Sequence, residues 1–206
     1  MKNINEEPLP VMLGIEITLY AGLRVGEICA LQWKHIDLDN KIINVCQTVQ
    51  RVKKRVKKGE GDKGSYLRLD TPKTPSSLRE VTIHPDLLAQ LSKMAKTDGE
   101  LYITTGTRQF MNPATYEYQY HRILKKACVT DVNYHTLRHS FTTACVESGM
   151  DIKTLSEILG HAKVATILDI YTHPSISMKQ KEIQKFPTYV HLQRNLPCGC
   201  AFFHYK

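Results

Sequence analysis

Apolar positions along the chain follow helical spacing in most segments and strand spacing in one central region. Residues 9–21 are apolar with mixed spacing and predict a mostly buried helix, and residues 25–33 predict a second helix after a turn at Gly22 and Arg24. Alternating and β-branched residues then predict strands, at 41–50, 66–70 and 78–85. We expect these strands to form a small antiparallel sheet of two or three strands with an intervening hairpin turn.

Helical patterns return after Pro85. They cover the following ranges: 86–96, 113–128, 136–148, 152–159 and 163–171. Gly149 and Gly160 stand where helix C-caps belong, and Asp151 is suited to an N-cap. The predicted fold class is therefore α+β, mainly helical, with a small antiparallel sheet near the N-terminal side.

The composition is that of a soluble globular domain. The chain has 206 residues, of which 42% are hydrophobic and 23% charged, so one domain of ordinary size can bury a real core. The N-terminus has no apolar region of the secretory type. The longest apolar stretch, residues 9–23, is interrupted by Glu16 and is too short to span a bilayer. We expect a cytoplasmic protein with no membrane partner.

Positive charge favours a polyanionic partner. Twenty-eight Lys and Arg residues against twenty Asp and Glu residues give a formal charge of +8. No basic amphipathic helix with an aromatic face stands out, so nucleic acid is favoured over a membrane surface. Six basic residues fall within the first eight positions of 51–64, which is either a solvated hairpin tip or an inserted hairpin that contacts the DNA backbone. They are Arg51, Lys53, Lys54, Arg55, Lys57 and Lys58.

The cysteines do not predict a metal site. Cys198 and Cys200 lie near His204, but the ligand spacing is wrong for a closed structural zinc site. The other four are scattered singly and are interpreted as small buried hydrophobic residues. They are Cys29, Cys46, Cys128 and Cys145. We expect no bound metal and a reduced chain.

The segment HTLRHSF, residues 135–141, is the strongest local indication of chemistry. His135, Arg138 and His139 are spaced three and four residues apart, so on a helix they share one face. Such groups resist burial unless an anion compensates them. At a helix N-terminus a phosphate can do so, because free N–H groups and the helix dipole point toward it. A solvated polar face is the alternative interpretation.

Two further basic residues are weak indications when taken alone. Arg24 in AGLRVGE lies at a helix start, either as a surface ion-pair partner of Glu27 or as a second guanidinium fork for a phosphate. Lys73 in TPKTPSSLR lies between two prolines in a turn. Such a lysine is usually plain surface, but it can also donate a proton to a leaving oxygen.

The stretch LGHAKVATILDIYTH, residues 159–173, contains His161 after a glycine and Tyr171 at the end of an apolar helix. By periodicity alone the tyrosine is filler and the histidine part of a capping turn. A phenol is a poor nucleophile at neutral pH because its unperturbed pKa is near 10. Surrounding cations would favour the phenolate and stabilise a phosphorane-like transition state.

Taken together, these motifs resemble the tyrosine recombinases of the phage integrase family. The motifs GLRVGE, PKT, HTLRH, LGH and DIYTH occur here in the order seen in that family. The resemblance covers roughly residues 9–186 and is greatest to integrases of conjugative transposons and related prophages. It implies the catalytic domain of a site-specific DNA recombinase that needs neither ATP nor a metal cofactor.

The resemblance also implies a role for each matching residue. Tyr171 would attack a scissile DNA phosphate and form a 3′-phosphotyrosyl link with a free 5′-hydroxyl. Arg24 and Arg138 would clamp the non-bridging oxygens, and Lys73 would protonate the leaving 5′-oxygen. His135 would act in proton transfer and positioning.

The other matching residues would support these five. His161 would donate a hydrogen bond to the phosphate. His139 and Glu27 would support the residues that bind it. The implied partner is double-stranded DNA at specific attachment sites, bound by a homotetramer.

The expected domain organisation departs from the family in two ways. Residues 1–186 would be the catalytic domain, and the separate DNA core-binding domain that usually precedes it does not fit before Leu9. Residues 187–206 remain an unassigned tail. Two other functions stay open. One is a non-catalytic DNA-binding remnant, because residues 141–160 also fit a helix-turn-helix, and the other is relaxation of DNA in the manner of a type IB topoisomerase.

Overall fold

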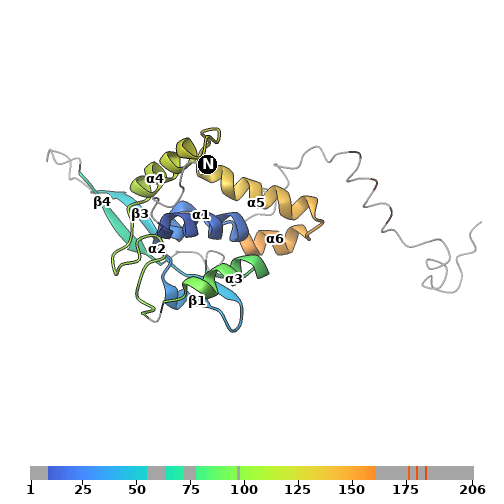
Figure 1. Cartoon of the computed structure of the whole chain (residues 1–206), viewed down its shortest axis with the longest axis horizontal. Coiled ribbons are helices and arrows are strands. Elements are labelled where there is room, and N and C mark those ends of the chain that lie inside the picture. The colour runs from blue at the N-terminus through green and yellow to red at the C-terminus, as the bar shows by residue number, and fades with distance from the viewer. Residues whose placement is uncertain are drawn as a thin grey trace, which may run out of the picture. The chain divides into compact units, whose positions relative to one another are not determined.

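The computed structural model describes residues 9–54, 64–71, 78–96 and 98–160, together with Ile176, Gln180 and Gln184. The chain divides into two units, residues 1–167 and 168–206. In the second unit the three described residues are helical and exposed. The first unit combines helices with small antiparallel sheets (Figure 1), so the predicted α+β class is confirmed.

Six α-helices lie in the described part of the first unit. They are α1 (Leu9–Ala21), α2 (Val25–Ala30), α3 (Pro85–Met94), α4 (Pro113–Lys126), α5 (His135–Glu147) and α6 (Ile152–Leu159). The central helix is α1, which contacts α2, α3, α4 and α5 (Figure 1). Its sequence is apolar on nearly every side, and a helix of that kind is stable only when other elements surround it.

The strands form two sheets, where the sequence predicted one. A three-stranded sheet has the order β1 (Ile36–Asp37), β2 (Ile42–Val45), β5 (Arg79–Thr82), and a separate hairpin pairs β3 (Thr48–Lys53) with β4 (Ser65–Asp70). All pairings are antiparallel. The predicted strand 41–50 is thus divided at Cys46 and Gln47, because its first half pairs with β1 and β5 and its second half with β4.

The second helix is shorter than predicted for a similar reason. Instead of continuing to Trp33, α2 ends at Ala30. The Leu31 carbonyl accepts a hydrogen bond from the Ile103 backbone N–H (2.9 Å), and the Trp33 N–H donates to Leu101 (3.0 Å). These long-range backbone bonds take the groups that a continuing helix would use, and a short 3-10 helix follows at Trp33–His35.

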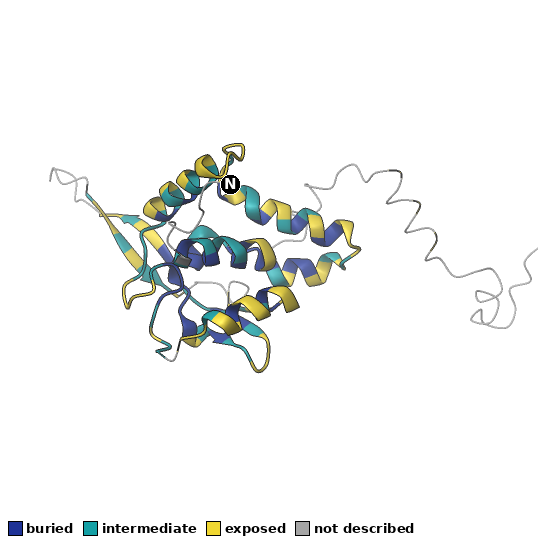
Figure 2. Ribbon diagram, viewed as in Figure 1, coloured by how far each residue is buried: buried dark blue, intermediate teal, exposed yellow. Residues whose placement is uncertain are grey.

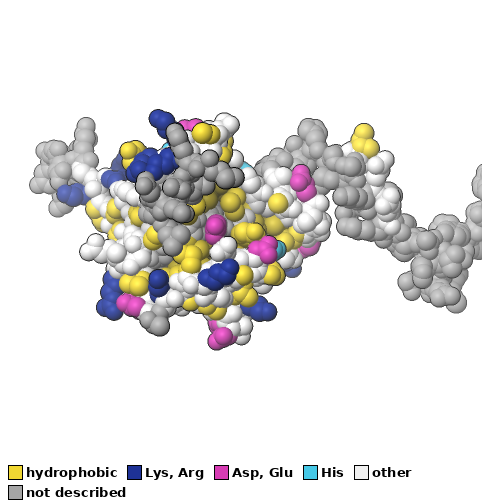
Figure 3. Space-filling view, viewed as in Figure 1, with side chains coloured by type: hydrophobic (Ala, Val, Ile, Leu, Met, Phe, Trp, Pro, Cys, Tyr) yellow, Lys and Arg dark blue, Asp and Glu magenta, His cyan; other side chains and the backbone are white. Residues whose placement is uncertain are grey.

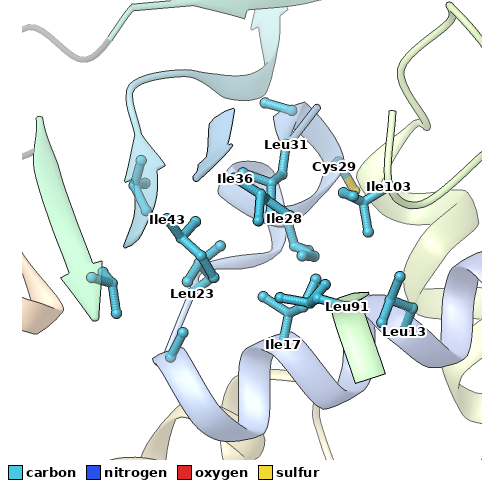
Figure 4. Packing of buried hydrophobic residues seen from close by; sticks show 14 of the residues in the cluster. Leu13, Ile17, Leu23, Ile28, Cys29, Leu31, Ile36, Ile43, Leu91 and Ile103 are labelled. Atoms are coloured by element: carbon cyan, nitrogen blue, oxygen red, sulfur yellow. The ribbon is translucent and has the colours of Figure 1, made fainter. Parts of the chain in front are cut away.

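The hydrophobic core lies between α1, α2, α3 and the three-stranded sheet (Figure 4). Each element contributes side chains that are almost fully buried. The residues labelled in the figure are Leu13, Ile17, Leu23, Ile28, Cys29, Leu31, Ile36, Ile43, Leu91 and Ile103. Figure 2 shows that buried positions also run along one side of α5 and α6. The core therefore holds the beginning of α5 and the end of α6 in fixed places.

The hairpin is packed closely onto α2 at its base. A Cβ atom added at Gly26 would lie 2.6 Å from Thr48 Oγ1 and 2.7 Å from the Val49 carbonyl oxygen. Only glycine permits this approach of helix to strand. The base of the β3–β4 hairpin is consequently fixed on the helix that Arg24 begins.

The three predicted cap residues around α5 and α6 lie where the sequence placed them. The Asp151 carboxylate caps α6 by accepting a hydrogen bond from the Thr154 N–H (2.8 Å), and Gly160 ends α6 with a left-handed φ of 62°. Gly149 follows α5 with a φ of 85°. The predicted helix 163–171 lies outside the described residues.

Two other predictions concern buried thiols and membrane helices. Cys29 and Cys145 are buried as expected, whereas Cys46 is half-buried and Cys128 is exposed just after α4, where it adopts a φ of 56°. The helical pattern that made Cys128 look buried ends two residues earlier, at Lys126. No helix in the described part of the chain is long and apolar enough to cross a membrane.

Candidate active site

Three arginines from three different elements meet at the C-terminal end of α6. The Arg79 Nε donates to the Ile158 carbonyl (2.6 Å), Arg138 Nη2 to the Leu159 carbonyl (2.6 Å), and Arg24 Nη2 to the Gly160 carbonyl (3.4 Å). The last carbonyls of a helix have no partner within the helix and carry the negative end of its dipole. Guanidinium groups satisfy both needs, so α6 ends on three successive arginine contacts.

Arg138 is held in the core-facing stripe of α5. Only 3% of this residue is exposed, and it shares its buried stripe with Thr142, Cys145 and Val146. Its Nη1 donates to the Gly22 carbonyl (2.5 Å) in addition to the bond to α6. The guanidinium therefore has its orientation set by backbone atoms of two other segments.

Gly22 is suited to this contact because it ends α1 with a left-handed φ of 63°. A Cβ atom there would lie 2.6 Å from Phe141 and 2.9 Å from Leu159. Both the backbone conformation and the crowding require glycine. The turn that frees its carbonyl for Arg138 is thus a direct consequence of the sequence at this position.

A buried carboxylate connects two of the arginines. Arg79 donates to Glu27 in a bidentate pair, with Nη1 to Oε1 at 3.0 Å and Nη2 to Oε2 at 2.8 Å. Arg24 begins α2 and donates to the same carboxylate from its backbone N–H (2.8 Å) and from Nη1 (2.8 Å). The Glu27 and Arg79 side chains are each 5% exposed, whereas that of Arg24 is 39% exposed. Arg24 is thus held by Glu27 while part of its side chain stays exposed to solvent.

The electrostatics keep this cluster cationic. Burial alone would raise the pKa of Glu27, but the hydrogen bonds and charge of Arg79, together with those of Arg24, lower it to about 2. Burial, with the like charges of Arg24 and Arg79, lowers the pKa of Arg138 to about 9. Three guanidinium groups therefore face one carboxylate at neutral pH. The surplus of positive charge can be balanced by an anion whose oxygens accept paired N–H donors, such as a phosphate.

His135 and His139 lie beside Arg138 on the exposed side of α5. Their rings meet edge to face with centroids 4.6 Å apart. Partial burial, followed by the charges of His139, Arg138 and Arg24, lowers the pKa of His135 below its usual value. A neutral imidazole at the start of a helix can accept a proton or a hydrogen bond. The Asn133 side chain fixes this helix start by accepting a hydrogen bond from the His135 backbone N–H (2.9 Å).

The residue before His135 is fastened to the core by a network of hydroxyl groups. The Tyr134 hydroxyl lies 2.5 Å from Thr18 Oγ1 in α1 and 3.5 Å from the Tyr116 hydroxyl in α4. The Tyr116 hydroxyl also donates to the Val11 carbonyl (3.2 Å). Buried hydroxyl groups that are satisfied in this way rigidify their surroundings. The first turn of α5 therefore has a rigid support from α1 and α4.

Comparison with known proteins decides the family. The model of the phage integrase family matches residues 1–178. The chain belongs to the phage integrase family. The ICEBs1 integrase of Bacillus subtilis (strain 168) is 31% identical over an alignment of 182 residues, and the match covers 81% of this chain and 45% of that protein. The integrase of Staphylococcus phage L54a is 28% identical over 190 residues, 86% of this chain and 51% of its own length.

Solved structures agree with this membership in the integrase family. The Tn1549 transposon integrase in complex with circular intermediate DNA matches with a TM-score of 0.65 and 25% identity, over 84% of this chain and 58% of that one. XerA recombinase matches with a TM-score of 0.56 and 26% identity, over 91% of this chain and 67% of that one. The chain spans about half the length of the curated relatives it matches.

The structure brings together five of the residues that the family resemblance singled out: Arg24, Glu27, His135, Arg138 and His139. The predicted shared face of α5 needs one correction. The two histidines are exposed, whereas Arg138 is buried, because its charge is compensated by backbone carbonyls as well as by Glu27. Lys73, His161 and Tyr171 lie outside the described residues, so their predicted roles stay predictions.

The predicted DNA-contacting residues are divided in the same way. Arg51, Lys53 and Lys54 are exposed on or just after β3, as expected for a basic hairpin. Arg55, Lys57 and Lys58 fall outside the described residues. Within the described ranges, no group of three His, Cys, Asp or Glu side chains is arranged to hold a metal ion.

Arg79, the buried partner of Glu27, was not predicted from the sequence. Its position did carry an indication. Arg79 is in step with Val81 and Ile83 in the alternating strand pattern, and both of those side chains are buried. A charged residue on the core-facing side of a strand needs a buried partner of opposite charge, and in the structure that partner is Glu27.

Proposed function

We propose that this chain is the catalytic part of a site-specific DNA recombinase. The hydroxyl of Tyr171 attacks a scissile phosphodiester, so that a Tyr171–phosphorus bond forms at the 3′ side while the bond to the 5′-oxygen breaks. A 5′-hydroxyl from a second strand then attacks the phosphotyrosine, which restores a phosphodiester and releases the tyrosine. The observation that carries this proposal is the cluster of oriented arginines at the end of α6, one residue before His161 and the segment with Tyr171.

The positions of Arg24 and Arg138 support their role as a phosphate clamp. Charge develops on the non-bridging oxygens in the transition state, and donors that are already oriented stabilise it most. Both guanidinium groups are oriented by bonds to α6, and Arg24 keeps an exposed part of its side chain. His135, at the first position of α5 with a lowered pKa, is suited to proton transfer beside them.

Lys73, His161 and Tyr171 complete the proposed reaction. Lys73 donates the proton that the departing 5′-oxygen requires, and His161 donates a hydrogen bond to the phosphate. The covalent intermediate keeps the free energy of the phosphodiester, so religation needs no ATP. The cationic side chains provide the stabilisation that metal ions provide in many phosphoryl-transfer enzymes.

Double-stranded DNA at specific attachment sites is the proposed substrate, bound by a homotetramer in the cytoplasm. The net charge of +8 and the exposed hairpin residues Arg51, Lys53 and Lys54 support DNA binding. Further Lys and Arg side chains lie near α4 on the face shown in Figure 3. The match to an integrase in complex with circular intermediate DNA supports the same substrate class.

A nicked suicide duplex tests the proposal. The duplex carries the sequence that this chain enriches from a randomised pool, with a nick beside the scissile phosphate so that the cleaved end diffuses away. We expect a covalent protein–DNA adduct with the parent chain and none with Tyr171→Phe. If the parent forms no adduct but retains DNA binding, the non-catalytic DNA-binding function replaces the recombinase. Relaxation of supercoiled plasmid without sequence preference would indicate the topoisomerase-like activity instead.

A further inference from the structure

We infer that Arg79 is a positioning residue for Arg24 and Arg138, the two proposed phosphate-binding arginines, and that it orients them by holding the groups that they contact. The inference rests on the proposed function and concerns the same site. Arg79 is buried, and its Nε, Nη1 and Nη2 atoms are all bonded to Ile158 or Glu27, so it is placed to orient other groups and not to contact DNA.

One branch of this arrangement runs through Glu27 to Arg24. The Arg79 guanidinium binds both carboxylate oxygens, which fixes the plane of the Glu27 side chain. The same two oxygens accept hydrogen bonds from the backbone N–H and from the Nη1 atom of Arg24. Arg24 therefore takes its direction from a carboxylate that Arg79 holds in place.

The other branch runs through the end of α6 to Arg138. Arg79 Nε donates to the Ile158 carbonyl, and the next carbonyl in the chain, that of Leu159, accepts from Arg138. Arg24 reaches the carbonyl after that, at Gly160. A displacement of the last turn of α6 would move the acceptors of all three arginines together.

Arg79 also connects parts of the chain that are far apart in sequence. It begins β5, lies 52 residues from Glu27 and 79 residues from Ile158, and follows Lys73 by six positions. One guanidinium thus joins the three-stranded sheet, α2 and α6. Its three donor atoms have three separate acceptors, a requirement that a lysine ammonium, as a single point donor, does not meet.

The first test compares Arg79→Lys and Arg79→Met with the parent chain on the enriched, nicked duplex. We expect the single-turnover rate of adduct formation at saturating DNA to fall about 100-fold in Arg79→Lys, because small misplacements of catalytic groups carry losses of that size. DNA affinity should change by no more than about twofold, because many other cations bind the backbone. The matched control is Arg108→Met, which removes an exposed arginine from its carboxylate partner Asp98.

The pH profile separates positioning from a general loss of stability. In Arg79→Met the buried Glu27 carboxylate loses the partner that most lowers its pKa, so the acid limb of the cleavage profile should move to higher pH. The double variant Glu27→Gln/Arg79→Met has no carboxylate to titrate and should lack that shift. A cleavage rate and profile in both Arg79 variants equal to those of the parent would overturn the inference. So would a fall in rate matched by an equal fall in DNA affinity or in the folded fraction.

A second readout requires no cleavage. In the DNA-free chain labelled with ¹⁵N-arginine, the Nε–H signals of Arg24 and Arg138 should shift or broaden in Arg79→Lys and stay in place in Arg108→Met. Unchanged signals in Arg79→Lys would overturn the inference. If these signals change but the parent chain forms no adduct, the positioning role stands and the proposed recombinase function fails.

Discussion

The cluster at α6 and the β3–β4 hairpin carry the same kind of charge in opposite surroundings. Arg138 and Arg79 are buried, and both are hydrogen-bonded to backbone carbonyls at the end of α6; Arg79 also pairs with the Glu27 carboxylate. Arg51 and Lys53 extend into solvent from β3, and the hydrogen bond of Arg51 to Ser65 Oγ (3.0 Å) is itself exposed. The buried arginine side chains are held in one orientation by their hydrogen bonds. The exposed hairpin side chains extend into solvent, where fewer contacts restrict them.

Positively charged side chains in these two surroundings suit two different functions. Stabilising a transition state requires donors that are oriented before the substrate arrives. Attracting a polyanion requires only enough charge near the surface, and screening by salt weakens it. We therefore expect substitutions in the cluster to change rates and substitutions in the hairpin to change affinity.

The largest effect is expected for Arg138→Ala. Cleavage of the nicked duplex should slow by about 100-fold to 1,000-fold, the usual loss when one oriented donor to a developing oxyanion is removed. DNA affinity measured in the same buffer should stay close to that of the parent. The comparison would break down if Arg138→Ala bound DNA far more weakly and yet cleaved at the parent rate once saturated.

The second effect concerns acid stability and Glu27. The folded pKa of about 2 lies below the ordinary value of 4.5, so the carboxylate contributes stability above pH 4.5 that is lost as the pH falls toward 2. Over that window the free energy of unfolding of the parent should fall by about 3 kcal/mol more than that of Glu27→Gln. Urea unfolding across the window measures both. Parallel curves would show that the carboxylate is not held by Arg79 and Arg24.

The third effect is expected in the hairpin. In the triple variant Arg51→Gln/Lys53→Gln/Lys54→Gln, the slope of log affinity against log salt should become shallower by about 0.9 for each DNA phosphate that the hairpin no longer neutralises. The rate of adduct formation at saturating DNA should not change. An unaltered salt slope would mean that this hairpin stays clear of the DNA backbone.

The smallest effect is expected for Arg108→Met. Arg108 pairs with Asp98 on the surface (3.0 Å), with 72% of its side chain exposed. Exposed ion pairs contribute little to stability, so the unfolding midpoint and the cleavage rate should match those of the parent. A large change in either would show that an exposed arginine outside the α6 cluster also controls stability or cleavage.

The sequence predicted those features that depend on neighbours along the chain. His135 and Arg138 were singled out by their spacing at the start of one helix, whereas Arg24 was a weak indication until the order of the motifs was considered. The N-cap at Asp151 and the left-handed Gly160 were predicted for the same reason. Such features need no knowledge of the tertiary fold.

Features set by distant partners were not predictable in this way. Arg79 is buried through contacts with residues more than 50 positions away. The early end of α2 depends on backbone hydrogen bonds with Leu101, which accepts, and Ile103, which donates, and the division of 41–50 into two strands depends on β4 and β5. Periodicity indicates which side chains face the core, but it does not indicate which distant segment packs against them.

The acceptors at the end of α6 are main-chain carbonyl oxygens. The arrangement therefore depends little on which side chains α6 carries and strongly on how many residues the helix contains. Exchanging Ile158 for another apolar residue of similar size leaves its carbonyl where it was. Inserting a single residue into α6 would turn that end of the helix by about 100° and carry all three oxygens away from their arginines. We therefore expect the exposed side chains of this helix to tolerate substitution, whereas a change in the number of residues between Asp151 and Gly160 should abolish cleavage.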